Sequence, residues 1–216
     1  MKRLFSIIAL FALSSAVIFS QNTGTIDQTG DDHKAFIDQA GQNNVADIIQ
    51  EHDGNWAEII QVNNNNEVII DQTNGSDNIA QVKQMGDQQH TFFRQNGDKN
   101  VFRLHQESGN NQVGVSDNPF MQNGDGNKFA GVGDDASGLF IDEGGYSYQY
   151  NGSVLDPQSI QDGDGNSIGL YQDGSWARIQ QIGNNNQALL KQGPTGNNAT
   201  IIQDGNRNSA SVRQWP

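Results

Sequence analysis

Polar and apolar residues alternate in short stretches along most of the chain. In residues 44–50, Ala46, Ile48 and Gln50 point to one side of an extended backbone and the residues between them to the other. The stretch before it, residues 40–43, contains Gly and Asn, which tolerate the positive φ angles of tight turns. The pattern predicts a β-strand of about seven residues followed by a turn of about four.

Glutamine shows that this strand and turn form a repeat. The unit is Gln-x-Gly-x-x-Asn-x-Ala-x-Ile-x-Gln, in which Val, Phe or Thr also occupy the Ala position and Val, Leu or Phe the Ile position. Most of the glutamines that carry it are 11 residues apart, with one spacing of 12, one of 9 and an interruption between Gln106 and Gln161. They are Gln28, Gln39, Gln50, Gln61, Gln72, Gln84, Gln95, Gln106, Gln161, Gln172, Gln181, Gln192, Gln203 and Gln214.

The length of the unit determines the fold class. Eleven residues are too few for a helical crossover, so successive strands must lie in facing sheets joined by tight arcs. Two units of 11 then complete one coil of 22 residues, and each strand stacks in parallel on the strand two units later, at about 4.8 Å. We therefore predict an all-β protein, a β-solenoid of two-strand coils with a cross-β, amyloid-like architecture.

Such stacking places like residues on like. Ladders of stacked amides can satisfy their own donors and acceptors along the axis, so we predict that the repeat glutamines form ladders. The predicted ladders also include asparagines, namely Asn44, Asn55, Asn66, Asn78, Asn100, Asn111, Asn166, Asn186, Asn197 and Asn208.

Small and branched apolar residues are expected to fill a thin core between the ladders. Outward positions are mixed, and the aromatic residues Trp56, Phe92 and Trp176 are predicted on the outer faces. The predicted core residues are Ala46, Ile48, Ala57, Ile59, Val68, Ile70, Ala80, Val82, Phe102, Leu104, Ala177, Ile179, Ala188, Leu190, Ala199, Ile201, Ala210 and Val212.

The composition narrows the function classes. Of the 216 residues, 25 are Gly, 26 Asn and 25 Gln, which alone would indicate a disordered, prion-like chain, whereas the repeat predicts order. Cysteine is absent, which excludes disulfides, Cys-based zinc sites and thiol catalysis. The net charge of −13 argues against nucleic acid or an anionic membrane as partner.

The first 20 residues predict export. Lys2 and Arg3 precede an apolar stretch from Leu4 to Phe19, which is typical of a secretory signal peptide cleaved after Ser20 and is shorter than the roughly 20 residues of a membrane span. Cleavage would remove two basic residues and give a net charge of −15. We divide the chain into a signal peptide (1–20), a short N-terminal segment (21–32), repeats (33–117), an irregular insert (118–160) and further repeats (161–216).

The unit resembles the curlin repeat of curli-type extracellular amyloid fibres. That family's motif is Ser-x5-Gln-x-Gly-x2-Asn-x-Ala-x3-Gln, and its second part is matched by Gln39, Gly41, Asn44, Ala46 and Gln50. The same positions recur at Gln203, Gly205, Asn208, Ala210 and Gln214. The leading Ser of the motif is mostly Asn in this chain.

The resemblance implies a secreted structural subunit, or a nucleator, of curli-like functional amyloid fibres. It also implies an extracellular or cell-surface location, roles in surface adhesion and biofilm matrix, and assembly by edge-to-edge β-stacking. The implied partners are further copies of the chain, related curlin subunits and a curli-type outer-membrane secretion channel. Neither nucleic acid nor a transmembrane segment after signal cleavage is expected.

Other function classes find less support in the sequence. The four histidines share no spacing typical of a catalytic or metal site, so we expect neither enzymatic activity nor a catalytic residue, metal or cofactor. The Asp- and Gly-rich stretches 125–127 and 162–166 are typical of calcium-binding turns and also of ordinary turns. The alternative function is a secreted β-solenoid adhesin, or a calcium-binding or ice-binding protein, that stays monomeric.

Overall fold

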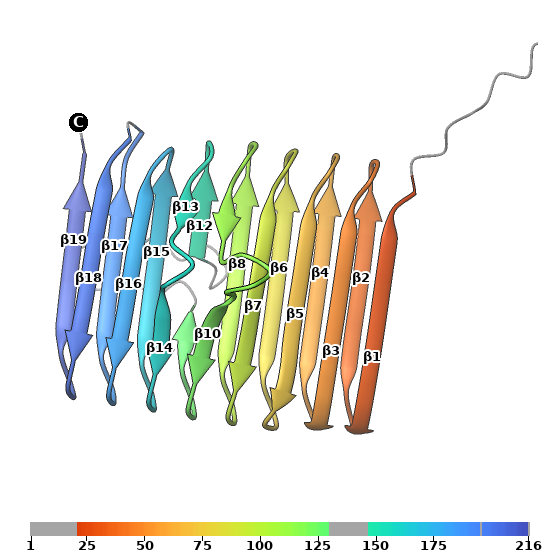
Figure 1. Cartoon of the computed structure of the whole chain (residues 1–216), viewed down its shortest axis with the longest axis horizontal. Helices are drawn as coiled ribbons and strands as arrows, with labels where there is room; N and C mark the ends of the chain where they lie inside the picture. Colours follow the sequence, from red (N-terminus) through yellow and green to blue (C-terminus); the bar gives the residue numbers. More distant parts are fainter. Residues whose placement is uncertain (1–20, 130–146, 195, 216) are drawn as a thin grey trace, which may run out of the picture.

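The computed structural model of the chain describes residues 21–129, 147–194 and 196–215, so the predicted signal peptide lies outside the described residues. Within these ranges, the regular secondary structure consists of β-strands. The named strands pair in parallel and form two facing stacks (Figure 1). The predicted β-solenoid is confirmed.

One stack, which we call sheet A, contains the strands that form the first half of each coil. Its strands are β1 (Thr23–Asp31), β3 (Val45–Asp53), β5 (Glu67–Asn74), β7 (His90–Asn96), β9 (Gln112–Val113), β10 (Phe120–Asn123), β13 (Val154–Leu155), β14 (Ile160–Asp162), β16 (Trp176–Ile182) and β18 (Asn198–Asp204).

The other stack, sheet B, supplies the second half of each coil. Its strands are β2 (Lys34–Ala40), β4 (Trp56–Val62), β6 (Ile79–Met85), β8 (Val101–Glu107), β11 (Lys128–Phe129), β12 (Ser147–Tyr150), β15 (Ser167–Asp173), β17 (Gln187–Gln192) and β19 (Ser209–Gln214).

The stack has eight coils, because several short strands share a level. Strands β9 and β10 both pair with β7, strands β11 and β12 both pair with β8, and strands β13 and β14 both pair with β16. The register is constant where the repeat is regular, so that Gln28 pairs with Gln50 and Gln39 with Gln61, 22 residues later. The predicted coil length is thus confirmed.

The divided levels arise from extra residues in the middle of a strand. Residues 114–119 replace the single residue Phe92 of the level below, and residues 130–146 replace the single residue Arg103. Residues 156–159 similarly stand opposite two residues of β16. The ends of each level therefore remain in register although the number of residues between them differs. Part of the predicted insert at 118–160 forms strands β10 to β14 of the stack, and residues 130–146 lie outside the described residues.

The core is a thin seam between the sheets, usually two apolar side chains per strand. Each predicted core residue up to Ile201 is buried, whereas Ala210 and Val212 are only partly buried because no coil follows them. Where the divided levels begin, the seam holds aromatic rings: Phe102 of β8 stacks on Phe93 of β7 at 3.9 Å and on Phe129 of β11 at 4.8 Å between ring centroids.

Phe92 lies on the outer face of sheet A but is shielded from solvent. Its side chain is only 7 % exposed. Residues 114–119 make an excursion at this level, and Ser116 and Pro119 lie beside Phe92 on the outer face of sheet A. An insertion in the strand above therefore covers a residue that alternation alone places in solvent.

The turns between sheets use two glycine positions of different character. Gly163 has a φ of 107°, and a Cβ at this position would lie 2.4 Å from the carbonyl oxygen of Gly183 in the next coil. Gly126 has a φ of 67° and open space around it, and the corresponding position in other coils is occupied by Lys99 and Arg207 with φ near 58°. Only the first position requires glycine for both φ and space.

This difference predicts the outcome of two substitutions. Gly163→Ala should lower the free energy of unfolding by about 1–3 kcal/mol, because it combines a strained φ with a backbone clash. Gly126→Asn should change it by less than about 1 kcal/mol, because Asn tolerates the left-handed conformation. Urea denaturation of the two variants measures both values, and equal losses would contradict the assignment of the turn positions.

Candidate functional site

Two continuous ladders of glutamine side chains run the length of the solenoid. In each sheet the Nε2 of one glutamine donates a hydrogen bond to the Oε1 of the glutamine in the next coil, over 2.7–3.1 Å. The ladder of sheet A consists of Gln28, Gln50, Gln72, Gln95, Gln122, Gln161, Gln181 and Gln203. That of sheet B consists of Gln39, Gln61, Gln84, Gln106, Gln149, Gln172, Gln192 and Gln214.

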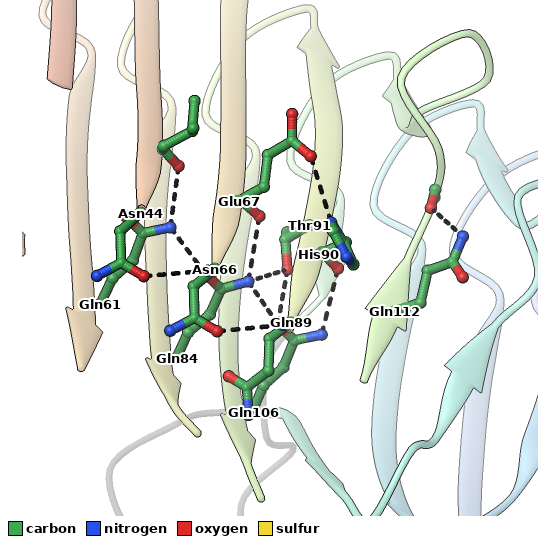
Figure 2. Close-up of polar contacts among 12 residues, drawn as sticks. Asn44, Gln61, Asn66, Glu67, Gln84, Gln89, His90, Thr91, Gln106 and Gln112 are labelled. Carbon is green, nitrogen blue, oxygen red and sulfur yellow. Dashed lines mark hydrogen bonds and ion pairs between the residues drawn. The ribbon is translucent and has the colours of Figure 1, made fainter. Parts of the chain in front are cut away.

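In the described residues, each ladder amide after that of Gln28 also bonds across the coil. The Nε2 of Gln95 donates to the carbonyl oxygen of Ile79 in the facing sheet at 3.2 Å, and that of Gln61 donates to the carbonyl oxygen of Val45 at 3.0 Å (Figure 2). One hydrogen of the amide therefore joins neighbouring coils and the other closes the arc between sheets. This double use leaves no unpaired donor on a glutamine that is fully buried.

The asparagines of the repeat follow a different scheme from the predicted amide-to-amide ladder. The Oδ1 of Asn44 accepts the backbone N–H of Asn66 at 3.0 Å, and its Nδ2 donates to the carbonyl oxygen of Ala40, four residues earlier. The same axial bond, at 2.8–3.1 Å, recurs in both sheets. At this position, directly before a strand, the Nδ2 is directed to a carbonyl of the turn, so the asparagine fixes the turn and its backbone partner instead. Axial amide-to-amide bonds of asparagine occur at the ends of strands, where Asn74 Nδ2 donates to Asn96 Oδ1 at 3.2 Å and Asn96 Nδ2 to Asn123 Oδ1 at 2.9 Å.

The fourth coil departs from this scheme because Gln89 replaces asparagine. Its backbone N–H donates to Asn66 Oδ1 at 3.1 Å, as an asparagine would (Figure 2). Its longer side chain donates to the carbonyl oxygen of Ser108. Beside it, the hydroxyl of Thr91 donates to Gln106 Oε1 at 2.9 Å. The coil thus remains hydrogen bonded despite the substitution.

The two ends of the solenoid differ in the hydrogen-bonding groups that their ladder glutamines leave free. At the N-terminal end, no group in the described part of the chain donates to the Oε1 of Gln28 or Gln39. At the C-terminal end, Gln203 and Gln214 each donate one amide hydrogen to a carbonyl across the coil, and the other has no acceptor in the described residues. The solenoid therefore ends in acceptors on one side and donors on the other.

Apolar surface is also uncovered at the N-terminal end. Ile26 is 45 % exposed, whereas Ile48, which pairs with it in the next coil, is fully buried. The two open edges also carry backbone N–H and C=O groups without a neighbouring strand, which is a template for pairing with another chain.

Charges lie on the outer faces, where few are paired. The described residues contain two ion pairs: Arg94 Nε lies 2.7 Å from Asp71 Oδ2, and His90 lies 3.3 Å from Glu67. Burial raises the pKa of the Asp47 carboxyl, and the carboxylates of Asp27 and Asp71 raise it further. Two other shifts arise mainly from burial, which lowers the pKa of His105 and raises that of Tyr171.

The described residues contain no group of three or more His, Cys, Asp or Glu side chains placed to hold a metal ion. Over the same ranges, no helix has the length and apolar character needed to cross a membrane. The Asp- and Gly-rich turns at 125–127 and 162–166 stack on each other, and Asp125 donates its backbone N–H to Asp164 Oδ1 at 2.9 Å. These turns have the hydrogen bonding of ordinary turns.

Comparison with known families gives a match over part of the chain. Residues 20–51 match the family described as curlin associated repeat. This stretch extends over β1 and β2 and into β3, which is one coil and the beginning of the next. Over these residues the chain is similar to a curlin associated repeat. No curated protein and no solved structure matches the chain significantly.

The structure places the predicted ladder residues in two kinds of position. The 14 predicted glutamines all lie in the two glutamine ladders, and the predicted asparagines all lie at the turn before a strand. In the last coil, the side chains of Asn197 and Asn208 donate to the carbonyl four residues earlier and have no axial partner in the described residues. Ladder and turn positions absent from the prediction are Asn22, Gln89, Gln122, Asn127, Gln149 and Ser153.

Most of the missed positions lie where insertions break the 11-residue spacing. Eleven positions separate Asn111 from Gln122, whereas six separate Asn44 from Gln50. A search for an Asn and a Gln in register that allows extra residues between them would have found Gln122. For Gln149, 22 positions after Asn127, the sequence holds no comparable signal.

Removing one amide from a buried ladder should be costly. Gln95→Ala would leave Gln72 Nε2 without its axial acceptor, and Gln122 Oε1 and the Ile79 carbonyl oxygen without a donor. At about 1–3 kcal/mol for an orphaned buried group, we expect a loss of at least 2 kcal/mol in unfolding free energy. Chemical denaturation of the mature chain measures it, with Gln42→Ala, at an exposed turn glutamine, as the control. A similar, small effect of both substitutions would argue against the ladder.

The raised pKa of Asp47 predicts a pH-dependent effect. The folded state binds more protons than the unfolded state just above about pH 4, so the stability that protonated Asp47 contributes is lost as pH rises through its folded pKa. Asp47→Asn should therefore stabilise the protein at pH 7 and have little effect at pH 3. Thermal melts across this range test it, with Asp204→Asn as the control at an exposed aspartate. A gain that is independent of pH would contradict the prediction.

Proposed function

We propose that the protein is a secreted structural subunit of curli-like amyloid fibres and that it polymerises by stacking coil on coil. The observation that carries the proposal is the pair of unlike, open ends on a stack of regular period. Among the described residues, the first coil and the last coil each have an open edge in both sheets. A second copy added at 4.8 Å would continue both sheets without a change of register.

The open groups of the ends are complementary. The unpaired amide hydrogens of Gln203 and Gln214 face the level at which Gln28 and Gln39 of a following copy would present their Oε1 atoms. The same joint would cover Ile26, which is exposed in the single chain. Stacking therefore extends the ladders and the apolar seam together.

The curlin associated repeat at residues 20–51 supports the extracellular part of the proposal, because this family is associated with extracellular fibres. The signal-type N-terminus is consistent with export by a secretion channel of the outer membrane. On this proposal the fibres serve surface adhesion and biofilm matrix, and related curlin subunits are additional partners. If the protein acts as a nucleator, the same open ends would serve, and a related curlin subunit would stack on them in place of a second copy of this chain.

The net charge explains how such a chain can remain soluble before assembly. With a charge of −15 after signal cleavage, free copies repel one another at a distance, while the axial bonds of the joint act only on contact. Aspartates in the turns add to this protection at the arcs.

The test is to incubate the purified chain from Gln21 onwards and to follow thioflavin fluorescence, electron microscopy and fibre diffraction. We expect unbranched fibres with a meridional reflection at about 4.7–4.8 Å. A chain that stays monomeric under these conditions, as a monomeric adhesin would, overturns the proposal.

A further inference from the structure

Charge is distributed very unevenly along the solenoid. Residues 21–62, which form the first two coils, contain eight acidic residues and one basic residue. Residues 174–215, which form the last two coils, contain four basic residues and one acidic residue. Strands β1 and β2 lie at one end of the stack and β18 and β19 at the other (Figure 1). One end is therefore acidic and the other basic.

The register of the ladders fixes which charges would meet at a joint between two copies. Gln192 pairs with Gln214 and Gln181 with Gln203, so the next level would place the following copy's Gln39 on Gln214 and its Gln28 on Gln203. Arg213, one residue before Gln214, then lies beside Asp38. Arg207, four residues after Gln203, lies beside Asp32.

The backbone conformation matches at the second of these positions. Arg207 and Asp32 both have a φ of 59° in the same turn of the coil. Both side chains are exposed. They would therefore leave the turn in the same direction, one level apart.

An ion pair between neighbouring coils already occurs inside the molecule at the position directly before a ladder glutamine. Asp71 and Arg94 precede their ladder glutamines by one residue, as Asp38 and Arg213 do, and lie on neighbouring levels. Their Nε–Oδ2 distance is 2.7 Å. Arg213 is also held at the end of β19 by its contact with the ring of Trp215, 5.9 Å from the guanidinium.

We propose that Arg207 and Arg213 at the C-terminal end, and Asp32 and Asp38 at the N-terminal end, determine which ends join. In the described part of the single chain, none of these four side chains is in an ion pair. A joint between unlike ends pairs all four, whereas two N-terminal ends would oppose aspartates and two C-terminal ends would oppose arginines. The inference rests on the proposed function, since it concerns the direction and fidelity of stacking.

The test reverses the charges at one end and then at both. The variants are Arg207→Asp with Arg213→Asp, Asp32→Arg with Asp38→Arg, and all four together. Each is added as monomer to its own sonicated fibres or, where it forms none, to wild-type fibres, and growth is followed by thioflavin fluorescence. We expect each one-end variant to elongate at least tenfold more slowly than wild type and the four-residue variant to return to within about threefold of it.

A matched control separates the joint from net charge. Lys83 precedes Gln84 by one residue, as Arg213 precedes Gln214, and Lys99 has the turn position of Arg207 with a φ of 58°. The variant Lys83→Asp with Lys99→Asp therefore makes the same change in net charge at equivalent positions in the middle of the stack. It should elongate faster than the variant reversed at Arg207 and Arg213.

The outcomes distinguish the two proposals. If the wild-type chain forms no fibres, the proposed function fails. If it does, but the one-end variants elongate like the mid-stack control, or the four-residue variant is not restored, the inference about the ends fails and the fibre proposal stands. Circular dichroism and melting of each monomer establish that the exposed substitutions leave the fold intact.

Discussion

The axial hydrogen bond between glutamine side chains is the interaction on which the rest of the structure depends. A coil of two short strands and two turns cannot bury enough apolar surface to be stable alone, so each coil must be fixed to its neighbours. Backbone pairing fixes their separation, and the glutamine amide adds a side-chain bond at the same interval while its second hydrogen closes the arc between sheets. The apolar seam can then be thin, and one or two branched side chains per strand suffice to fill it.

This dependence explains how much of the fold was predictable from the sequence. The position of a ladder residue is set by spacing, and a spacing of 11 is visible in one sequence without any alignment. Burial followed from alternation in the regular coils, where Ala46 and Ile48 are buried as predicted. The hydrogen bonds of the asparagines before the strands did not follow, because the local turn conformation directs their Nδ2 to a turn carbonyl, and spacing carries no information on that direction.

The insertions show where sequence periodicity stops describing the structure. The fold requires the asparagine and the glutamine of a level to stay in register with their neighbours, and the residues between them need not be of fixed number. Extra residues in mid-strand therefore break the sequence repeat without breaking the stack. Phe92 illustrates the consequence, since its burial depends on residues 114–119, more than 20 positions later in the chain.

The mid-strand insertions of residues 114–119 and 156–159 would recur along any polymer built from this chain. They interrupt the outer face at the middle of the stack, in the fifth and sixth of eight coils, far from both ends. At about 4.8 Å per level, eight levels extend roughly 38 Å. A fibre of stacked copies would then have a continuous core and a periodic outer surface, with one irregular feature repeated at this interval. Residues of this feature could change in sequence without any change at the joints.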